Sequence, residues 1–168
     1  FYAFDTRRAG GVTLHDASRT ETTSASGIVT NRYDHHEASA EAWFGVAGLP
    51  DGDVVGRWRL GITRLADTYD NPMAGAIDPL PADRLFVYPW LEYEHAENRF
   101  RTLTNISRMF RNEDIDIGTG WRLRGGMTNS RFGSEQDGIL VQYDWHDTLG
   151  SGTHHLLRNR FHADLFID

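Results

Sequence analysis

Apolar and polar residues alternate one by one through most of this chain, and this period of two constrains the fold more than any other feature of the sequence. The stretch DIDIGTGWRLRGGM (114–127) is a long example. We call each set of alternate residues a file. One file of this stretch contains Ile115, Ile117, Thr119, Trp121, Leu123 and Met127, and the other contains Asp114, Asp116, Arg122 and Arg124. Successive side chains of a β-strand point to opposite faces of a sheet. The pattern therefore predicts strands with one apolar and one polar face.

The same alternation recurs in four further segments, two of which form a predicted hairpin. Residues 38–46 and 54–63 flank the turn signal LPDGD, which favours antiparallel pairing of the two strands. Residues 139–146 and 156–168 alternate in the same way. We count about seven amphipathic strands, with one or two more within residues 1–18. The sequence thus predicts an all-β protein.

Two segments between the predicted strands have the composition of loops. Residues 67–84 contain Pro72, Pro79 and Pro81, three of the five prolines of the chain. Residues 19–31 (RTETTSASGIVTN) are small and polar, and we expect an exposed loop there.

The segment 85–110 is more ambiguous. Pro89 lies inside the predicted strand 85–94 and has no N–H to donate, so we expect an edge strand or a bulge there. The residues HAEN (95–98) suggest a turn. Residues 99–110 fit an apolar helical face as well as a strand, and the β-branched Thr102, Thr104 and Ile106 favour the strand.

Composition limits the class of protein. The chain has 168 residues, enough for one domain with a substantial core. Twenty-four acidic residues against 17 basic ones, all of them arginine, give a net charge of −7, which argues against a nucleic-acid partner. The absence of cysteine excludes disulfides and thiolate metal sites.

The two ends of the sequence and its apolar runs bear on export. The N-terminal residues lack the pattern of a signal peptide, and no run approaches the roughly 18 apolar residues of a membrane-spanning helix. The chain opens without Met and stops within an alternating pattern, so we expect a mature or excised part of a longer protein.

The charged character of the polar file favours a membrane barrel over a soluble sheet. A transmembrane barrel needs a paired polar lumen, an apolar outer band and aromatic residues near the edges of the band. Membrane strands also need about 9 to 11 residues, whereas soluble strands have a mode of about 5 to 6. The aromatic residues expected near segment ends are Tyr88, Trp90, Tyr143, Trp145, Phe161 and Phe166. We therefore predict an antiparallel up-and-down transmembrane β-barrel of about 8 to 10 strands, complete in itself or part of a larger barrel, with a soluble β-sandwich or barrel binding module as the alternative.

The predicted connections do not alternate cleanly in length, as those of an outer-membrane barrel should. Either residues 85–109 form one long bulged strand, or one predicted turn is misplaced.

The segment 85–127 resembles the barrel of the BamA/TamA-type outer-membrane family, the bacterial surface antigens. The likeness lies in the aromatic-proline strand VYPW, the EN corner before RF, and the passage TNISRMFRNEDIDIGTG that leads into a long amphipathic strand. The resemblance implies a protein of the Gram-negative outer membrane that inserts or translocates other proteins. Its implied partners are outer-membrane lipids and client outer-membrane proteins.

Two features of that family are not matched in this sequence. The family carries an Arg-Gly-aromatic loop motif inside the barrel, whereas the nearest match, Arg124-Gly125-Gly126, lacks the aromatic residue and lies in a predicted strand. No periplasmic polypeptide-binding domains precede the barrel in this chain. Both differences are expected of an internal fragment.

Candidate enzymatic and metal-binding residues are few. His35-His36 and His154-His155 would each supply one ligand per sheet face, so we interpret them as solvated turn histidines. Asp144 with His146, and His162 with Asp164, have the spacing of a carboxylate–histidine pair, and an ion-pair network explains them better. In the sequence HHEAS, Ser39 is the one local candidate for a lipase nucleophile. The glycine clusters lack the context of a phosphate loop. We predict no enzyme, no catalytic residue, no cofactor and no metal.

The strongest constellation is a charged network on the polar files of neighbouring strands. We predict that it faces the lumen of the barrel, where it either holds the lumen shut or sets the ion preference of a passive pore. Its members are Arg57, Arg59, Asp114, Asp116, Arg122, Arg124, Asp144, Arg158, Arg160 and Asp164.

Overall fold

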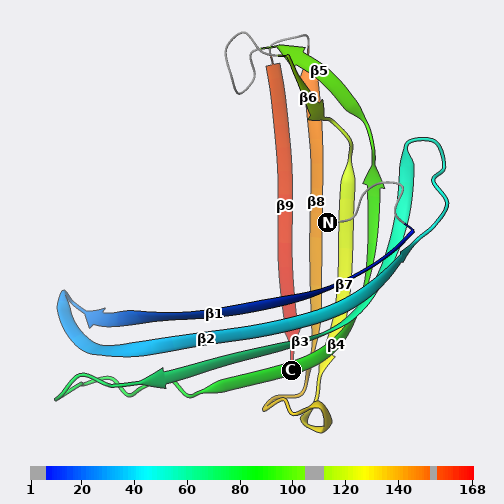
Figure 1. The fold of residues 1–168 in the computed structure, drawn as a ribbon. Helices are drawn as coiled ribbons and strands as arrows, with labels where there is room; N and C mark the ends of the chain where they lie inside the picture. The colour runs from blue at the N-terminus through cyan, green and yellow to red at the C-terminus, as the bar shows by residue number, and fades with distance from the viewer. Residues whose placement is uncertain (1–6, 105–111, 152–154) are drawn as a thin grey trace.

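A computed structural model describes residues 7–104, 112–151 and 155–168 of the chain (Figure 1). The described chain is all-β, with about 75% of its residues in strands. The elements are β1 (Arg8–Ala25), β2 (Ile28–Ala47), β3 (Val54–Asp70), β4 (Arg84–Glu97), β5 (Phe100–Thr104), β6 (Asn112–Asp116), β7 (Gly120–Thr128), the short 3-10 turn η1 (Ser130–Phe132), β8 (Gly138–Ser151) and β9 (His155–Ile167). None of the described residues forms a helix long and apolar enough to cross a membrane.

Seven of these strands form one antiparallel sheet in the order β1-β2-β3-β4-β7-β8-β9. The sheet curls into a half-barrel, in which β1 to β3 run across the view of Figure 1 and β7 to β9 stand nearly upright. Strands β5 and β6 pair with each other and extend the β4–β7 hairpin. Neighbouring strands of the main sheet are therefore consecutive in the chain, except β4 and β7, whose hairpin continues through β5 and β6. This is the order that the up-and-down prediction requires.

The two faces of the curled sheet differ in chemistry and in exposure. One register row on the convex face joins Phe44, Leu60 and Leu91, and the next strands continue it with Val141 and Leu165. Leu60 is 62% exposed, whereas Glu92 on the concave face is 1% exposed. Side chains on a concave face converge and cover one another, and those on a convex face diverge. The apolar file is thus the exposed one.

The polar segment 19–31 is not a loop, and that prediction is wrong. Its residues form the far end of the β1–β2 hairpin, which turns at Ser26 and Gly27 with φ values of 51° and 80°. Within this tip, Thr22 pairs with Arg32 and Thr23 pairs with Asn31. Alternation disappears there because both faces of the hairpin tip are polar, so periodicity gives no strand signal.

The stretch 114–127 is not one strand either. Strand β6 ends at Asp116 and β7 begins at Gly120. Between them the Asp116 carboxylate accepts a hydrogen bond from the Gly118 N–H at 2.8 Å, a local side-chain contact that competes with the ladder. The long strand is therefore two strands joined by a bend.

The expected turn at 95–98 is also wrong, because β4 pairs with β7 and the chain continues in the same hairpin arm into β5. The strand prediction for 99–110 is confirmed over Phe100–Thr104, and its remainder lies largely outside the described residues. With that turn removed, the two longest described connections, 71–83 and 129–137, fall at the same end of the sheet. The irregular alternation of connection lengths came from the misplaced turn.

Strand β4 lies between β3 and β7 and shows no register shift with either, so as a whole it is neither the expected edge strand nor a bulged one. Trp90, the neighbour of Pro89, is the first residue of β4 that pairs with β7, and the ladder does not extend to Pro89. Beyond this point Ser134 takes over the ladder's role, since its Oγ accepts from Val87 N–H and donates to Val87 C=O, both at 2.7 Å. The loop 129–137 therefore satisfies the backbone that Pro89 leaves unpaired.

Replacing Ser134 by alanine is expected to lower the free energy of unfolding by about 1 to 3 kcal/mol, because Ser134 is buried and the Val87 N–H and C=O lose their partner. Urea unfolding followed by tryptophan fluorescence measures this. Ser130→Ala, in the same loop and exposed, serves as the control. Equal unfolding midpoints for the two variants would contradict the assignment.

Candidate functional site

The candidate site is the centre of the concave face, where four adjacent strands bring charged side chains together. Arg59 of β3 lies opposite Glu92 of β4, which in turn lies opposite Arg124 of β7. Glu41 of β2 lies opposite Thr63 of β3. The period of two places all five side chains on one face, and the curl of the sheet brings them within contact distance.

Glu92 is the hub of this cluster. Its carboxylate accepts from Arg124 Nε at 2.7 Å and forms a direct ion pair with Arg59. Arg122 Nε lies 3.9 Å from the same carboxylate. A carboxylate that is 1% exposed is strongly destabilised unless it is paired, and the surrounding guanidinium groups supply that pairing.

Trp90 forms the base of the cluster. The Arg124 guanidinium carbon lies 3.7 Å from the centre of the Trp90 ring, within the range of a cation–π contact. The ring N–H donates to Thr63 Oγ1 at 2.9 Å. Glu41 then accepts from both Thr63 Oγ1 and Arg124 Nη1, each at 2.9 Å. The contacts of Trp90, Thr63, Glu41 and Arg124 therefore close into a ring.

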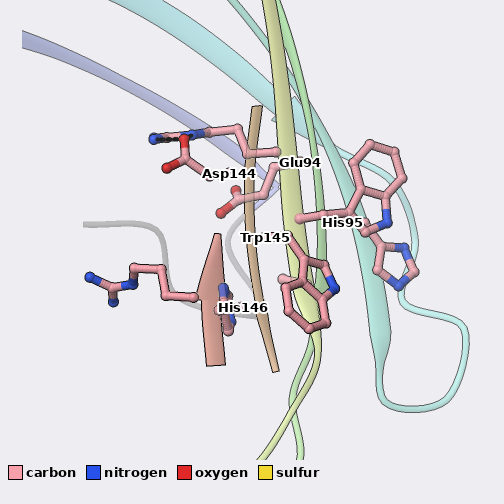
Figure 2. A pocket seen from close by; sticks show the side chains of 9 residues that line it. Glu94, His95, Asp144, Trp145 and His146 are labelled. Atoms are coloured by element: carbon pink, nitrogen blue, oxygen red, sulfur yellow. Dashed lines mark hydrogen bonds and ion pairs between the residues drawn. The ribbon is translucent and has the colours of Figure 1, made fainter. Parts of the chain in front are cut away.

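The network continues towards both flanks of the hub. On β3, Arg57 Nη1 donates to Glu94 at 3.3 Å. On β7, Arg122 Nε donates to Asp144 at 3.0 Å. Figure 2 shows Glu94 and Asp144 on one side of these strands and His95 and Trp145 on the other. The charged and the apolar files are therefore separated by the sheet itself.

The far flank of the network lies on β8 and β9. His162 stands between two carboxylates, at 2.8 Å from Asp144 and 2.9 Å from Asp164. Gln142 donates to Asp164 at 3.1 Å. The Asp144–His162–Asp164 arrangement is a chain of hydrogen bonds that become ion pairs when His162 is protonated. His146, the other predicted partner of Asp144, lies beside Arg160 at the cavity of Figure 2.

The structure brings together six of the ten predicted network residues, namely Arg57, Arg59, Arg122, Arg124, Asp144 and Asp164. Asp114 and Asp116 lie in β6, outside the main sheet, and Asp114 accepts from Thr102 at 2.6 Å. Arg158 and Arg160 lie on β9, and neither forms an ion pair with a described carboxylate. The network is thus centred on β2 to β8 and not on the edge strand.

The acidic members at the centre, Glu41, Glu92 and Glu94, were missed. Alternation in 85–94 is obscured because Tyr88 and Trp90 share the polar file with both glutamates of β4. Counting positions from Glu92 in steps of two would have placed Tyr88, Trp90, Glu92 and Glu94 on one face of β4.

The aromatic residues divide between the two faces in a way that residue position alone did not predict. Tyr88 and Trp90 are buried on the concave face, and Phe166 contacts Phe86 there with ring centroids 6.0 Å apart. Those three are not part of an outer belt. The convex face instead carries a line of ring contacts at one end of the apolar rows. It consists of Trp58–Tyr93 at 4.8 Å, Tyr93–Trp121 at 5.3 Å and Tyr143–Phe161 at 6.2 Å.

The two residues of the His35-His36 dipeptide point to opposite faces, as predicted, but His35 is not solvated. It is 6% exposed, with Nδ1 at 2.9 Å from Glu21 and Nε2 at 2.9 Å from Asp67. Tyr69 stacks on its ring with a centroid distance of 4.5 Å. The hydrogen bonds to Asp67 and Glu21 raise the pKa of His35, and the bond from His35, together with that from Arg19, lowers the pKa of Glu21 to about 2. His154 lies outside the described residues, as does the side chain of His155.

The contacts of His35 with Glu21 and Asp67, here called the His35 clamp, predict an effect on stability that depends on pH. A raised His35 pKa stabilises the fold below its ordinary value of 6.5, and the effect is lost as pH rises through the folded-state pKa. A lowered Glu21 pKa stabilises the fold above 4.5, and the effect is lost as pH falls towards 2. The loss of unfolding free energy in His35→Gln is therefore expected to be largest between pH 4.5 and 6.5.

The measurement is urea unfolding of wild type and His35→Gln across this pH range, with His36→Gln as the matched control on the opposite face. A difference between His35→Gln and wild type that stays constant from acid to alkaline pH would contradict the clamp.

The arrangement of hydroxyl and imidazole groups does not pair Ser39 with His36. Ser39 lies opposite His15 and Leu65 in the ladder, on the face away from His36. His36 Nδ1 contacts Ser18 Oγ at 2.8 Å on the convex side, where both side chains are open to solvent. Within the described ranges, no group of three or more histidines and carboxylates is arranged to hold a metal ion.

Comparison with known proteins gives no match to a family model, to a curated protein or to a solved structure. The functional argument therefore rests on the geometry of this chain.

Proposed function

We propose that this chain forms part of the wall of a transmembrane β-barrel in a bacterial outer membrane. One observation carries the proposal: the usual distribution of polarity is inverted. The most buried large side chains of the described chain include Glu92 and Asn31 beside Trp90 and Val55, while most of the described leucine, isoleucine and phenylalanine side chains are exposed. A soluble sheet buries its apolar face and hydrates its polar one. A membrane barrel does the opposite, because its outer face contacts lipid.

The extent of the exposed apolar surface supports the same conclusion. Every strand of the main sheet contributes to it, from Leu14 on β1, which is 76% exposed, to Leu165 on β9, which is 53% exposed. Soluble monomers rarely expose contiguous apolar patches beyond a few hundred Å². The line of aromatic contacts from Trp58 to Trp121 fits the interfacial girdle of a membrane barrel. Outer-membrane lipids are thus the proposed partners of the convex face.

A finer role in inserting or translocating client proteins rests on the BamA/TamA-like segment alone. That segment corresponds to β4, the β5–β6 extension and β7, which form one long hairpin. Arg124, the arginine of the Arg-Gly-Gly sequence, is engaged with Glu92 and Glu41 within the wall. We therefore assign Arg124 to the wall of the barrel. Binding of a client protein then depends on other residues.

Brominated-lipid quenching of single-tryptophan variants tests the membrane proposal. The chain has five tryptophans, of which Trp58 is half exposed on the convex face and Trp90 is buried on the concave face. In vesicles with brominated acyl chains, a variant that retains Trp58 alone should be strongly quenched. A variant that retains Trp90 alone should not.

Two other outcomes would refute the proposal. Recovery of the chain from detergent-free buffer as a compact monomer with both tryptophans unquenched would favour the soluble binding module. Equal quenching of Trp58 and Trp90 would mean that the two faces are not separated by lipid.

A further inference from the structure

We infer that the Glu92-centred network seals the concave face of β2 to β7 with its own side chains, so that this part of the wall lines no open aqueous channel. The inference rests on the proposed membrane barrel and assigns the Glu92-centred network a closing role. It selects between the two roles that the charged residues allow, a shut lumen and an ion-selective pore.

The first support is that side chains of the concave face are buried although no described strand lies across from them. The described chain is a half-barrel, so nothing faces its concave side, yet Trp90 is 2%, Thr63 5% and Arg57 6% exposed. Neighbouring side chains of the same face must therefore cover these groups. Arg124 does so directly, since its guanidinium lies 3.7 Å above the Trp90 ring. Water in an open channel would reach side chains on the wall, and here it does not reach them.

The reach of the network is the second support. Arg124 on β7 bonds to Glu41 on β2 at 2.9 Å, although β3 and β4 lie between these strands. Three strand spacings correspond to about 14 Å along a flat sheet. The contact is possible because long side chains lie across the concave face and the sheet curls towards them. Such side chains occupy the space next to the wall in place of solvent.

Charge balance is the third support. Four arginines of the cluster face four carboxylates, and every one takes part in an ion pair. They are Arg57, Arg59, Arg122 and Arg124 against Glu41, Glu92, Glu94 and Asp144. An ion-selective pore uses rings of one sign of charge that remain free to bind the ion. Within this cluster, a self-neutralised layer offers a passing ion no such site. Arg158 and Arg160, which form no ion pair with a described carboxylate, lie outside the cluster on β9.

Cysteine accessibility in lipid vesicles tests this inference, and the chain is suited to it because it contains no native cysteine. Three single substitutions are compared for reaction with a charged, water-soluble methanethiosulfonate. Thr63→Cys lies beneath the network, Asp164→Cys lies on the concave face with its native side chain half exposed, and Leu60→Cys lies on the convex face. The reaction rate reports whether water reaches each thiol.

The expected result is that Asp164→Cys reacts at least about tenfold faster than Thr63→Cys, and that adding Arg124→Ala raises the Thr63→Cys rate by at least about tenfold. Leu60→Cys should stay unreactive in both backgrounds, which shows that the Arg124→Ala barrel is still folded in the membrane.

Each other outcome has a distinct meaning. Thr63→Cys reacting as fast as Asp164→Cys, with Leu60→Cys unreactive, would overturn the sealed wall and leave the membrane barrel standing. An unreactive Thr63→Cys that Arg124→Ala does not expose would overturn the closing role of the network. A reactive Leu60→Cys in the wild-type background would refute the membrane barrel itself.

Discussion

Leu60→Arg should prevent stable insertion of the chain into lipid bilayers. Leu60 is 62% exposed at the centre of the apolar convex rows, between Phe44 on β2 and Leu91 on β4. An arginine on the lipid face of a membrane barrel costs about 2 to 4 kcal/mol at the bilayer midplane. Folding into vesicles, followed by protease protection, should fall accordingly.

Leu49→Arg is the matched control for this variant. Leu49 is 75% exposed, more than Leu60, but it lies in the connection between β2 and β3, beyond the apolar rows. The same change of side chain should leave insertion nearly unaffected. If Leu49→Arg and Leu60→Arg impair insertion equally, the effect is one of charge on the chain as a whole and not of the convex face.

Glu92→Ala should be the most destabilising single change on the concave face. It leaves Arg59 and Arg124 without their common partner in a buried environment, and breaking a buried ion pair in this way costs about 3 to 5 kcal/mol. Urea unfolding in lipid vesicles measures the loss. Glu92→Gln keeps the size of the side chain and should show most of the same loss, because the charge and not the volume is what the arginines require.

Asp164→Ala tests whether position within the network matters. Its side chain is 51% exposed and pairs with His162, so the loss should be at most about 1 kcal/mol, as for exposed ion pairs in general. Losses of the same size for Glu92→Ala and Asp164→Ala would show that the network has no hub.

The strand content and the hairpin of 38–46 with 54–63 followed from local pattern, because alternation and turn residues act over a few neighbours. The errors also have local causes. The tip of the β1–β2 hairpin is polar on both faces and therefore gave no strand signal. Polar residues occupy even positions both before and after the bend that follows Asp116, so the alternation gave no sign of the bend.

The sequence predicted the arginines of the candidate site but not its glutamates. Arg122 and Arg124 stand in clean alternation, whereas Glu92 follows Tyr88 and Trp90, two aromatic residues that share its face. An aromatic residue at a position of the polar file obscures the alternation of apolar and polar residues. Only the three-dimensional contact of Trp90 with Arg124 shows why an aromatic ring belongs there.

The sequence by itself determined that this protein has strands with one apolar and one charged face, since the period of two requires nothing beyond the chain's own geometry. It did not determine which face is outside, because both directions of curl are compatible with the same alternation. The tertiary structure decided that. The sheet curls towards the charged file, and Arg124 meets Glu41 across 83 positions of sequence. Convergence on the concave face buries the charges and leaves the leucines exposed.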